Sequence, residues 1–243
     1  MTLSIEEYAV IGDEHTAAIV GANGSIDWLC LPDFDSPACF ASLLGEESNG
    51  FFRLAPANAE DVLATKRAYR GDSLILETEF ETTTGRVRVI DFMPVRSVHP
   101  RVIRVVEGLS GTVDMRLDLT VRFGYGDIVP WVTSTKGLVR FAAGPDALAL
   151  WHRVHPSGEG LSTVADFTVA EGQRYPFTLV WFPSHEDPPP PLDTYYSMHV
   201  SDGYWQDWAA RCTYRANGAT RSFARSSLSS RSPTLPPVAS WPQ

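Results

Sequence analysis

Short runs of alternating apolar and polar residues recur along the first 182 residues of the chain. The clearest is residues 74–82, where Leu74, Leu76 and Phe80 alternate with Glu77 and Glu79. A period of two predicts a β-strand with one buried and one solvated face. A Thr-Thr-Gly turn follows, and residues 86–93 resume the alternation. We therefore expect an antiparallel pair, with the glutamates on its solvated face and not in an acidic site.

Similar runs predict about a dozen short strands, spaced as in a β-sandwich or β-barrel. No helix of ordinary length is predicted among these strands. Residues 108–111, Gly-Leu-Ser-Gly, are expected to be a turn between two strands. The strands expected after residue 100 are 101–107, 114–123, 131–135, 138–142, 148–153, 163–169 and 175–182.

The stretch from residue 11 to residue 45 predicts a hairpin that carries a rigid loop. Residues 17–20 and 25–31 flank Asn23-Gly24, a pair that readily adopts tight hairpin turns. The loop Pro32–Pro37 is bracketed by prolines, and residues 38–44 are expected to form a short helix ending at Gly45. A loop fixed on a hairpin is a plausible place for chemistry or for docking.

Four side chains of this stretch are candidates for ligand contact. Asp33 and Asp35 could form a carboxylate pair, but aspartates in such loops also stabilise turns through their own side chains. Asp27 and Trp28 could bind a sugar by hydrogen bond and ring stacking, although a strand tryptophan is commonly a core residue. Both interpretations stay open for each pair.

The composition of the chain and its expected secondary structure change after residue 182. Residues 183–193 are a stiff, proline-rich spacer, and Asp193-Thr194 can cap a helix expected over 194–215. Trp205 and Trp208 lie on an apolar stripe of this helix, which is interpreted as packing surface. Residues 216–243 are rich in Ser, Arg and Pro and are expected to form a disordered basic tail.

Composition narrows the function classes. The net charge of −9 and the lack of Lys/Arg clusters argue against nucleic acid or an anionic membrane as partner. Three cysteines without a Cys-x-x-Cys pair are expected to be reduced thiols in a cytoplasmic protein. The N-terminus does not look like a secretory signal, and no 18-residue apolar stretch predicts a membrane span. His152-x-x-His155 lacks further ligands, so we expect neither a metal site nor a cofactor.

The chain resembles the N-terminal, trehalase-like domain of bacterial glycoside hydrolase family 15 proteins over residues 5–214. The matching segments are IEEYAVIGDEHTAAIV, GSIDWLCLPDFDSPACFASLLG, LETEFETTTGRVRVIDFMP, VRFGYGDIVPWV, FPSHEDPPPP and YWQDWAARCTYR. The resemblance implies a large β-sandwich joined by a linker helix to an (α/α)6 barrel. It also implies hydrolysis of α-glucosidic bonds, trehalose among them, with inversion by two barrel glutamates. No position here matches those glutamates.

We therefore expect an accessory domain that is catalytically inactive alone. The resemblance places Asp27, Trp28, Asp33 and Asp35 at most on the rim of the sugar pocket, and Asp33 departs from the family, which commonly has arginine there. Side chains expected to dock on the barrel are Phe34, Trp205 and Trp208. The alternative is a stand-alone carbohydrate-binding or scaffolding module.

The chain is expected to stop before the barrel begins. The segment after about Ala216 can be written in codons that, when translated in a shifted reading frame, give the residues with which the family continues. Our hypothesis is that this tail is an out-of-frame reading of the barrel's first helix, and the nucleotide sequence of the gene would test it.

Overall fold

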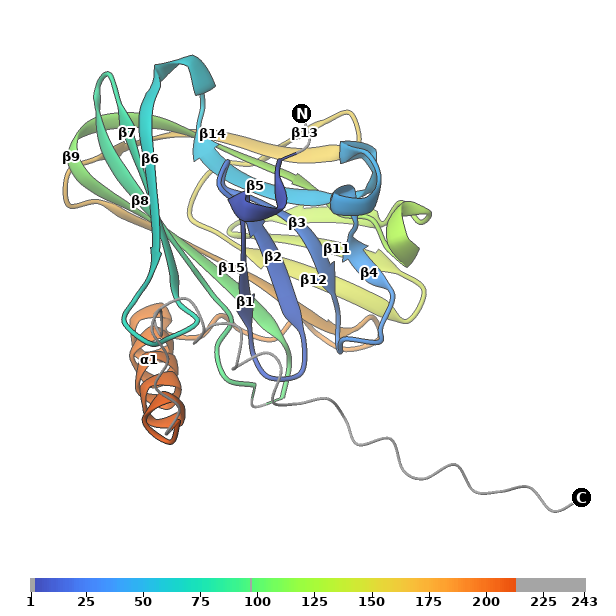
Figure 1. The fold of residues 1–243 in the computed structure, drawn as a ribbon. Helices are drawn as coiled ribbons and strands as arrows, with labels where there is room; N and C mark the ends of the chain where they lie inside the picture. The colour runs from blue at the N-terminus through green and yellow to red at the C-terminus, as the bar shows by residue number, and fades with distance from the viewer. Residues whose placement is uncertain (1–2, 97, 213–243) are drawn as a thin grey trace, which may run out of the picture.

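The computed structural model describes residues 3–96 and 98–212, in which antiparallel strands form one large continuous sheet folded into two layers. Figure 1 shows β6–β8 on one side of the molecule and β1–β3 with β5 on the other. The expected all-β antiparallel sandwich with one C-terminal helix is confirmed. The tail 216–243, and the helical residues expected beyond 212, lie outside the described residues.

Each layer is built largely from hairpins. The first layer contains β1 (Tyr8–Gly12), β2 (Ala17–Gly21), β3 (Ser25–Cys30), β4 (Ala38–Phe40), β5 (Phe51–Pro56), β13 (Ser157–Glu159) and β14 (Ser162–Ala170). The second contains β6 (Val62–Tyr69), β7 (Leu76–Thr82), β8 (Gly85–Phe92), β10 (Trp131–Thr135), β11 (Leu138–Ala143), β12 (Asp146–Trp151) and β15 (Arg174–Pro183). Short 3-10 turns connect them: η1 (Ile5–Glu7), η2 (Ser42–Leu44), η3 (Glu47–Asn49), η4 (Ala59–Asp61) and η5 (Gly124–Gly126).

The strand β9 (Arg101–Thr120) belongs to both layers. Its first half pairs with β8 and β15, and its second half pairs with β5 and β14. The expected turn at residues 108–111 is therefore wrong: the chain continues as one strand and bends there. Any side chain at Gly108 would overlap the carbonyl oxygen of Ala170, and Gly111 has φ +65°, so the glycines permit the bend without ending the strand.

A buried ion pair joins the two layers inside the core. Asp91 on β8 and Arg104 on β9 are both fully buried, with Nε–Oδ1 and Nη2–Oδ2 distances of 2.7 and 3.1 Å. Arg104 also donates to the carbonyls of Phe52 at 2.5 Å and Gly24 at 2.8 Å, which belong to the other layer. Four acceptors thus satisfy one guanidinium, as a buried charge requires.

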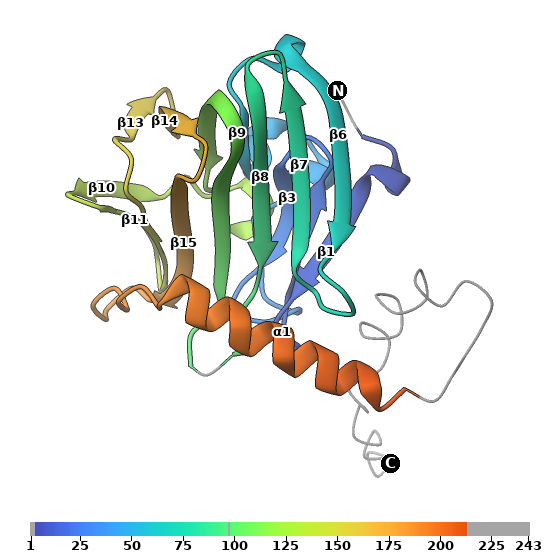
Figure 2. The ribbon, with the colours of Figure 1, turned by 90° about the vertical axis from the view of Figure 1, so that its left-hand side faces the viewer.

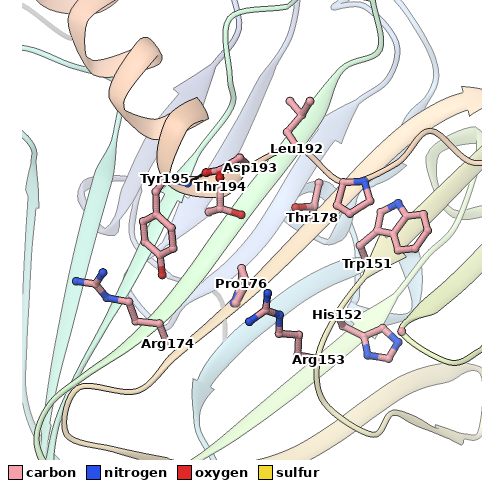
Figure 3. A pocket seen from close by; sticks show the side chains of 12 residues that line it. Trp151, His152, Arg153, Arg174, Pro176, Thr178, Leu192, Asp193, Thr194 and Tyr195 are labelled. Carbon is pink, nitrogen blue, oxygen red and sulfur yellow. Dashed lines mark hydrogen bonds between the residues drawn. The ribbon is translucent and has the colours of Figure 1, made fainter.

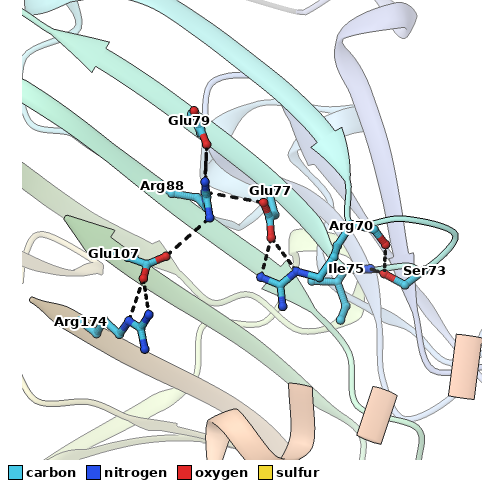
Figure 4. Close-up of polar contacts among 8 residues, drawn as sticks. All are labelled: Arg70, Ser73, Ile75, Glu77, Glu79, Arg88, Glu107 and Arg174. Carbon is cyan, nitrogen blue, oxygen red and sulfur yellow. Dashed lines mark hydrogen bonds and ion pairs between the residues drawn. The ribbon is translucent and has the colours of Figure 1, made fainter. Parts of the chain in front are cut away.

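The outer face of the second layer divides into a charged part and an apolar part. In the charged part, Arg88 pairs with Glu79 at 2.6 Å and Arg70 with Glu77 at 2.5 Å (Figure 4), so the expected solvated face of β7 is confirmed. The apolar part contains Ile75, Ile90, Phe92, Ile103 and Val105, against which Met198 packs.

The helix α1 (Thr194–Ala210) covers this apolar part. Figure 2 shows it lying across the ends of β7, β8 and β15. As expected, Asp193 caps it, and its Oδ1 accepts hydrogen bonds from the amides of Tyr195 and Tyr196 at 3.0 and 2.8 Å. The helix expected over 38–44 is wrong: residues 38–40 pair with β3 as β4, and only the single turn η2 follows.

Candidate functional site

The loop Pro32–Pro37 is fixed by an arginine that lies about sixty residues away in the sequence. Arg96 Nη1 donates to Asp33 Oδ1 at 2.6 Å, and Arg96 Nη2 donates to the Pro32 carbonyl at 2.6 Å. The same guanidinium pairs with Asp13, whose side chain is fully buried in the β1–β2 turn, at an Nε–Oδ2 distance of 2.8 Å. Arg96 therefore holds the β1–β2 turn and the loop together.

The contacts with Arg96 determine which side chains of the loop Pro32–Pro37 are free to meet a ligand or another domain. Asp33 directs its charge to Arg96, and its backbone N–H and carbonyl bond to Ser36, so it serves as a turn residue as well as an ion-pair partner. Asp35 is exposed and forms no polar contact with the described residues. Phe34 projects from the loop with 57% of its surface exposed. The loop thus presents an aromatic ring and one unpaired carboxylate on a rigid base.

Asp27 lies at the centre of a buried hydrogen-bond network. Its Oδ1 accepts from the hydroxyls of Ser25 at 2.5 Å and Ser42 at 3.2 Å, and its Oδ2 accepts from Tyr8 at 3.0 Å. Burial, together with the nearby Asp27 charge, raises the pKa of Tyr8 to about 12. Because both oxygens of Asp27 are occupied and the residue is only 9% exposed, the geometry supports a structural role.

Trp28 is half-buried and forms one end of an exposed apolar surface. Its ring packs on Cys30, Ala38 and Ala41 and lies 6.1 Å from the ring of Tyr125, centroid to centroid. Tyr125 has φ +63°, an unusual conformation for a residue with a side chain, within the tight turn η5. Strained backbone positions of this kind cluster at functional sites, so this turn is a candidate for a functional contact.

Further exposed apolar side chains lie in η5 and in the segment that follows it, up to residue 132. The exposed large apolar side chains of this segment are Tyr125, Ile128, Val129, Trp131 and Val132. Trp131 is 77% exposed and begins β10, an edge strand paired only with β11 among the described residues. We call the set Phe34, Trp28, Tyr125, Ile128, Val129, Trp131 and Val132 the apolar rim. β4 connects its two parts, because it follows the loop of Phe34 and contacts η5.

Comparison with known proteins establishes the family. The family described as "Trehalase-like, N-terminal" matches residues 1–165. The chain belongs to this family. The trehalase of Thermoplasma volcanium is 28% identical over 86% of this chain, and that of Thermoplasma acidophilum is 30% identical over 81%. The trehalase of Mycobacterium tuberculosis is 29% identical over 83% of this chain.

This trehalase-like domain spans about a third of the length of the curated relatives it matches: 34% of both Thermoplasma proteins and 32% of the mycobacterial one. Intact relatives carry a catalytic domain after the matched region. The resemblance drawn from the sequence segments is therefore confirmed at the level of the family and of its N-terminal part.

The linker helix of the trehalase-like domain uses its aromatic stripe internally. Trp205 is 4% exposed, and its ring lies 5.4 Å from that of Tyr204 and 6.3 Å from that of half-buried Trp208. The stripe was expected to be packing surface, and Trp205 packs as expected. Docking of Trp205 and Trp208 on another domain stays a prediction.

Several kinds of chemistry find no support within residues 3–96 and 98–212. This part of the chain holds no cluster of three His, Cys, Asp or Glu side chains fit for a metal ion. No helix there is long and apolar enough to cross a bilayer. Asp27 accepts hydrogen bonds from Tyr8, Ser25 and Ser42, whereas Asp33 pairs with Arg96, so these two carboxylates have separate protein partners. Their role at a substrate rim stays a prediction.

Sequence reasoning missed the two residues that organise this region. Arg96 was overlooked because nothing near it in the sequence suggests that it reaches the loop. The second is Tyr125, which lies between Gly124 and Gly126, and all three residues have positive φ. A glycine on both sides of one aromatic residue was the available signal that the backbone turns sharply and holds the ring outward.

Proposed function

We propose that the chain is the accessory N-terminal domain of a trehalase-type glycoside hydrolase, without hydrolytic activity of its own. The observation that carries this proposal is the family match, which is to the N-terminal part of proteins about three times as long. The accessory role then consists in docking on the catalytic domain that follows this region in intact relatives and in stabilising it. Two buried thiols, Cys30 and Cys39, support the further proposal of a reducing, cytoplasmic compartment.

The carboxylates of the described residues support the absence of hydrolysis. Inverting hydrolysis needs a protonated carboxylic acid and a carboxylate base on opposite sides of the bond, about 6.5–9.5 Å apart. Burial raises the pKa of Asp118, as a general acid would require, but Asp118 lies opposite Arg53 in the pairing of β9 with β5, and it lines neither the pocket beside Trp151 nor the pocket beside Val139. Asp27 and Asp33 are bound to protein groups.

The apolar rim is the surface we propose for docking on the catalytic domain. Several of its exposed apolar side chains lie near the contact between Trp28 and Tyr125, and exposed apolar groups of this kind are typical of interface cores. The occupant is the catalytic domain because relatives have about two-thirds of their length beyond this region. Trp28 and Tyr125, whose ring centroids are 6.1 Å apart, would be its aromatic anchors, because aromatic residues often contribute much of the binding free energy of an interface.

Two measurements test this function. The purified chain should release no glucose from trehalose or maltose above a blank, and turnover would contradict the proposal. The second uses a chimera in which this chain replaces the matched region of the Thermoplasma acidophilum trehalase. Tyr125→Ser should lower the stability of the chimera by about 1–3 kcal/mol, yet leave the isolated chain nearly unchanged. Leu63→Ser, at an exposed position on β6, is the matched control and should affect neither.

A further inference from the structure

A pocket lies where the proline-rich spacer meets the outer face of the second layer (Figure 3). Its volume is about 350 Å³, and its walls come from the ends of β12 and β15, the spacer and the first turn of α1. Pockets of about 300–1,000 Å³ are the usual size for small-molecule sites. None of its lining residues belongs to the apolar rim, so it is separate from the proposed docking surface.

Two aromatic side chains form walls of the pocket, and each contacts another group of the chain. Trp151 Nε1 donates to the carbonyl of Pro189 at 2.9 Å, so the spacer itself holds the ring. The ring of Tyr195 lies 5.2 Å from the guanidinium of Arg174, and Arg174 Nε donates to Glu107 Oε1 at 2.8 Å. Ligand binding would therefore need little reordering of either ring, which favours affinity.

The polar groups of the pocket suit a neutral ligand. Arg153 is exposed, extends toward the space between Trp151 and Tyr195 in Figure 3, and forms no hydrogen bond or ion pair with the described residues. Asp193 contributes a carboxylate whose Oδ1 caps the amides of Tyr195 and Tyr196. Because a carboxylate already occupies the helix N-terminus, an anion would meet like charge there and would lack free amide donors.

We propose that this pocket binds a neutral saccharide the size of one or two sugar rings. The apolar face of a pyranose ring can stack on Trp151, while its hydroxyls accept from Arg153 and donate to Asp193. An aromatic wall with one strong donor and one strong acceptor matches a molecule that has an apolar face and a hydroxyl edge. All the lining residues of the pocket belong to this chain, so the isolated chain suffices to test it.

The test is a titration of the full chain, followed by NMR, with glucose, maltose, trehalose and cellobiose, and with glucose 6-phosphate as the anionic probe. We expect saturable binding of at least one neutral sugar below about 50 mM. Arg153→Ala should weaken it about fivefold or more, because a charged hydrogen bond is lost. Trp151→Phe should weaken it as well. Leu63→Ser, at an exposed position on β6 outside the pocket and the apolar rim, should leave it unchanged.

Three results would overturn the proposal. The first is the absence of saturable binding for all four neutral sugars. The second is tighter binding of glucose 6-phosphate than of glucose, which would indicate an anion site. The third is equal affinity in Arg153→Ala and the parent chain, which would place any binding elsewhere. Arg153 is exposed, so its replacement should not disturb folding, and a circular dichroism spectrum checks this. Failure here would leave the hydrolysis and docking tests unaffected.

Discussion

The buried ion pair between Asp91 and Arg104 offers the sharpest test of what holds the two layers together. In Asp91→Ala, the guanidinium of Arg104 stays buried and loses two of its four hydrogen bonds, keeping only the carbonyls of Phe52 and Gly24. Removing one partner of a buried pair typically costs about 3–5 kcal/mol, because the remaining charge is uncompensated. We expect a loss of this size in the free energy of unfolding.

Urea unfolding measures this loss. With a denaturant slope of about 2–3 kcal/mol per molar, the midpoint of Asp91→Ala should fall by about 1–2.5 M. The control is Asp166→Ala, which removes an exposed pair with Arg116 at 3.2 Å and should cost less than about 1 kcal/mol. The double variant with Arg104→Met should regain only part of the loss, because the carbonyls of the other layer then lose their donor. An Asp91→Ala loss no larger than the control would refute the reasoning.

Three further predictions concern the loop, a buried histidine and the bend in β9. Arg96→Met should destabilise by about 3 kcal/mol in urea unfolding because it leaves a buried carboxylate unpaired, whereas Asp33→Asn, at a half-exposed partner, should cost less than about 1 kcal/mol. Burial lowers the pKa of His152 below 6.5 in the folded chain, so the unfolded chain takes up a proton at a higher pH than the folded chain does. The free energy of unfolding should therefore fall as the pH drops below about 6.5, and it should fall less steeply in His152→Gln. Gly111→Ala should lower the unfolding midpoint more than Gly160→Ala, since both have positive φ but only Gly111 lacks space.

Each of these has a clear contrary result. Equal losses in Arg96→Met and Asp33→Asn would mean that Arg96 does not hold the loop through its buried partner. Parallel stability–pH curves for the parent chain and His152→Gln between pH 7.5 and 5.5 would mean that the imidazole is not buried in its neutral form. Equal midpoints for the two glycine variants would mean that the close backbone approach at the bend is absent.

Local signals in the sequence predicted much of the fold. Asn23-Gly24 and the period-two run 74–82 located hairpins correctly, because turn chemistry and alternation act between neighbours in the sequence. The same logic failed at residues 108–111, where two glycines suggested a turn. There the backbone needs glycine to pass close to another strand while it continues in β conformation, and a single sequence does not distinguish the two uses.

The candidate site was less predictable because its decisive contacts are non-local. Asp33 was recognised as a candidate, but its partner Arg96 lies 63 residues further along the chain. Asp91 looked like one more polar residue of a strand until Arg104 of the next strand was placed beside it. Residues 38–40 have an apolar composition that fits a helix or a strand, and pairing with β3 decided between them.

The central claim, that this domain docks on a catalytic domain through the apolar rim, is tested most directly by hydrogen–deuterium exchange. The measurement compares the isolated chain with the chimera that carries the remainder of the Thermoplasma acidophilum trehalase, once trehalose hydrolysis shows that the chimera is folded. We predict slower exchange at residues 123–132 and around Trp28 in the chimera, with no change on β6. Unchanged exchange at residues 123–132 in an active chimera would contradict the claim.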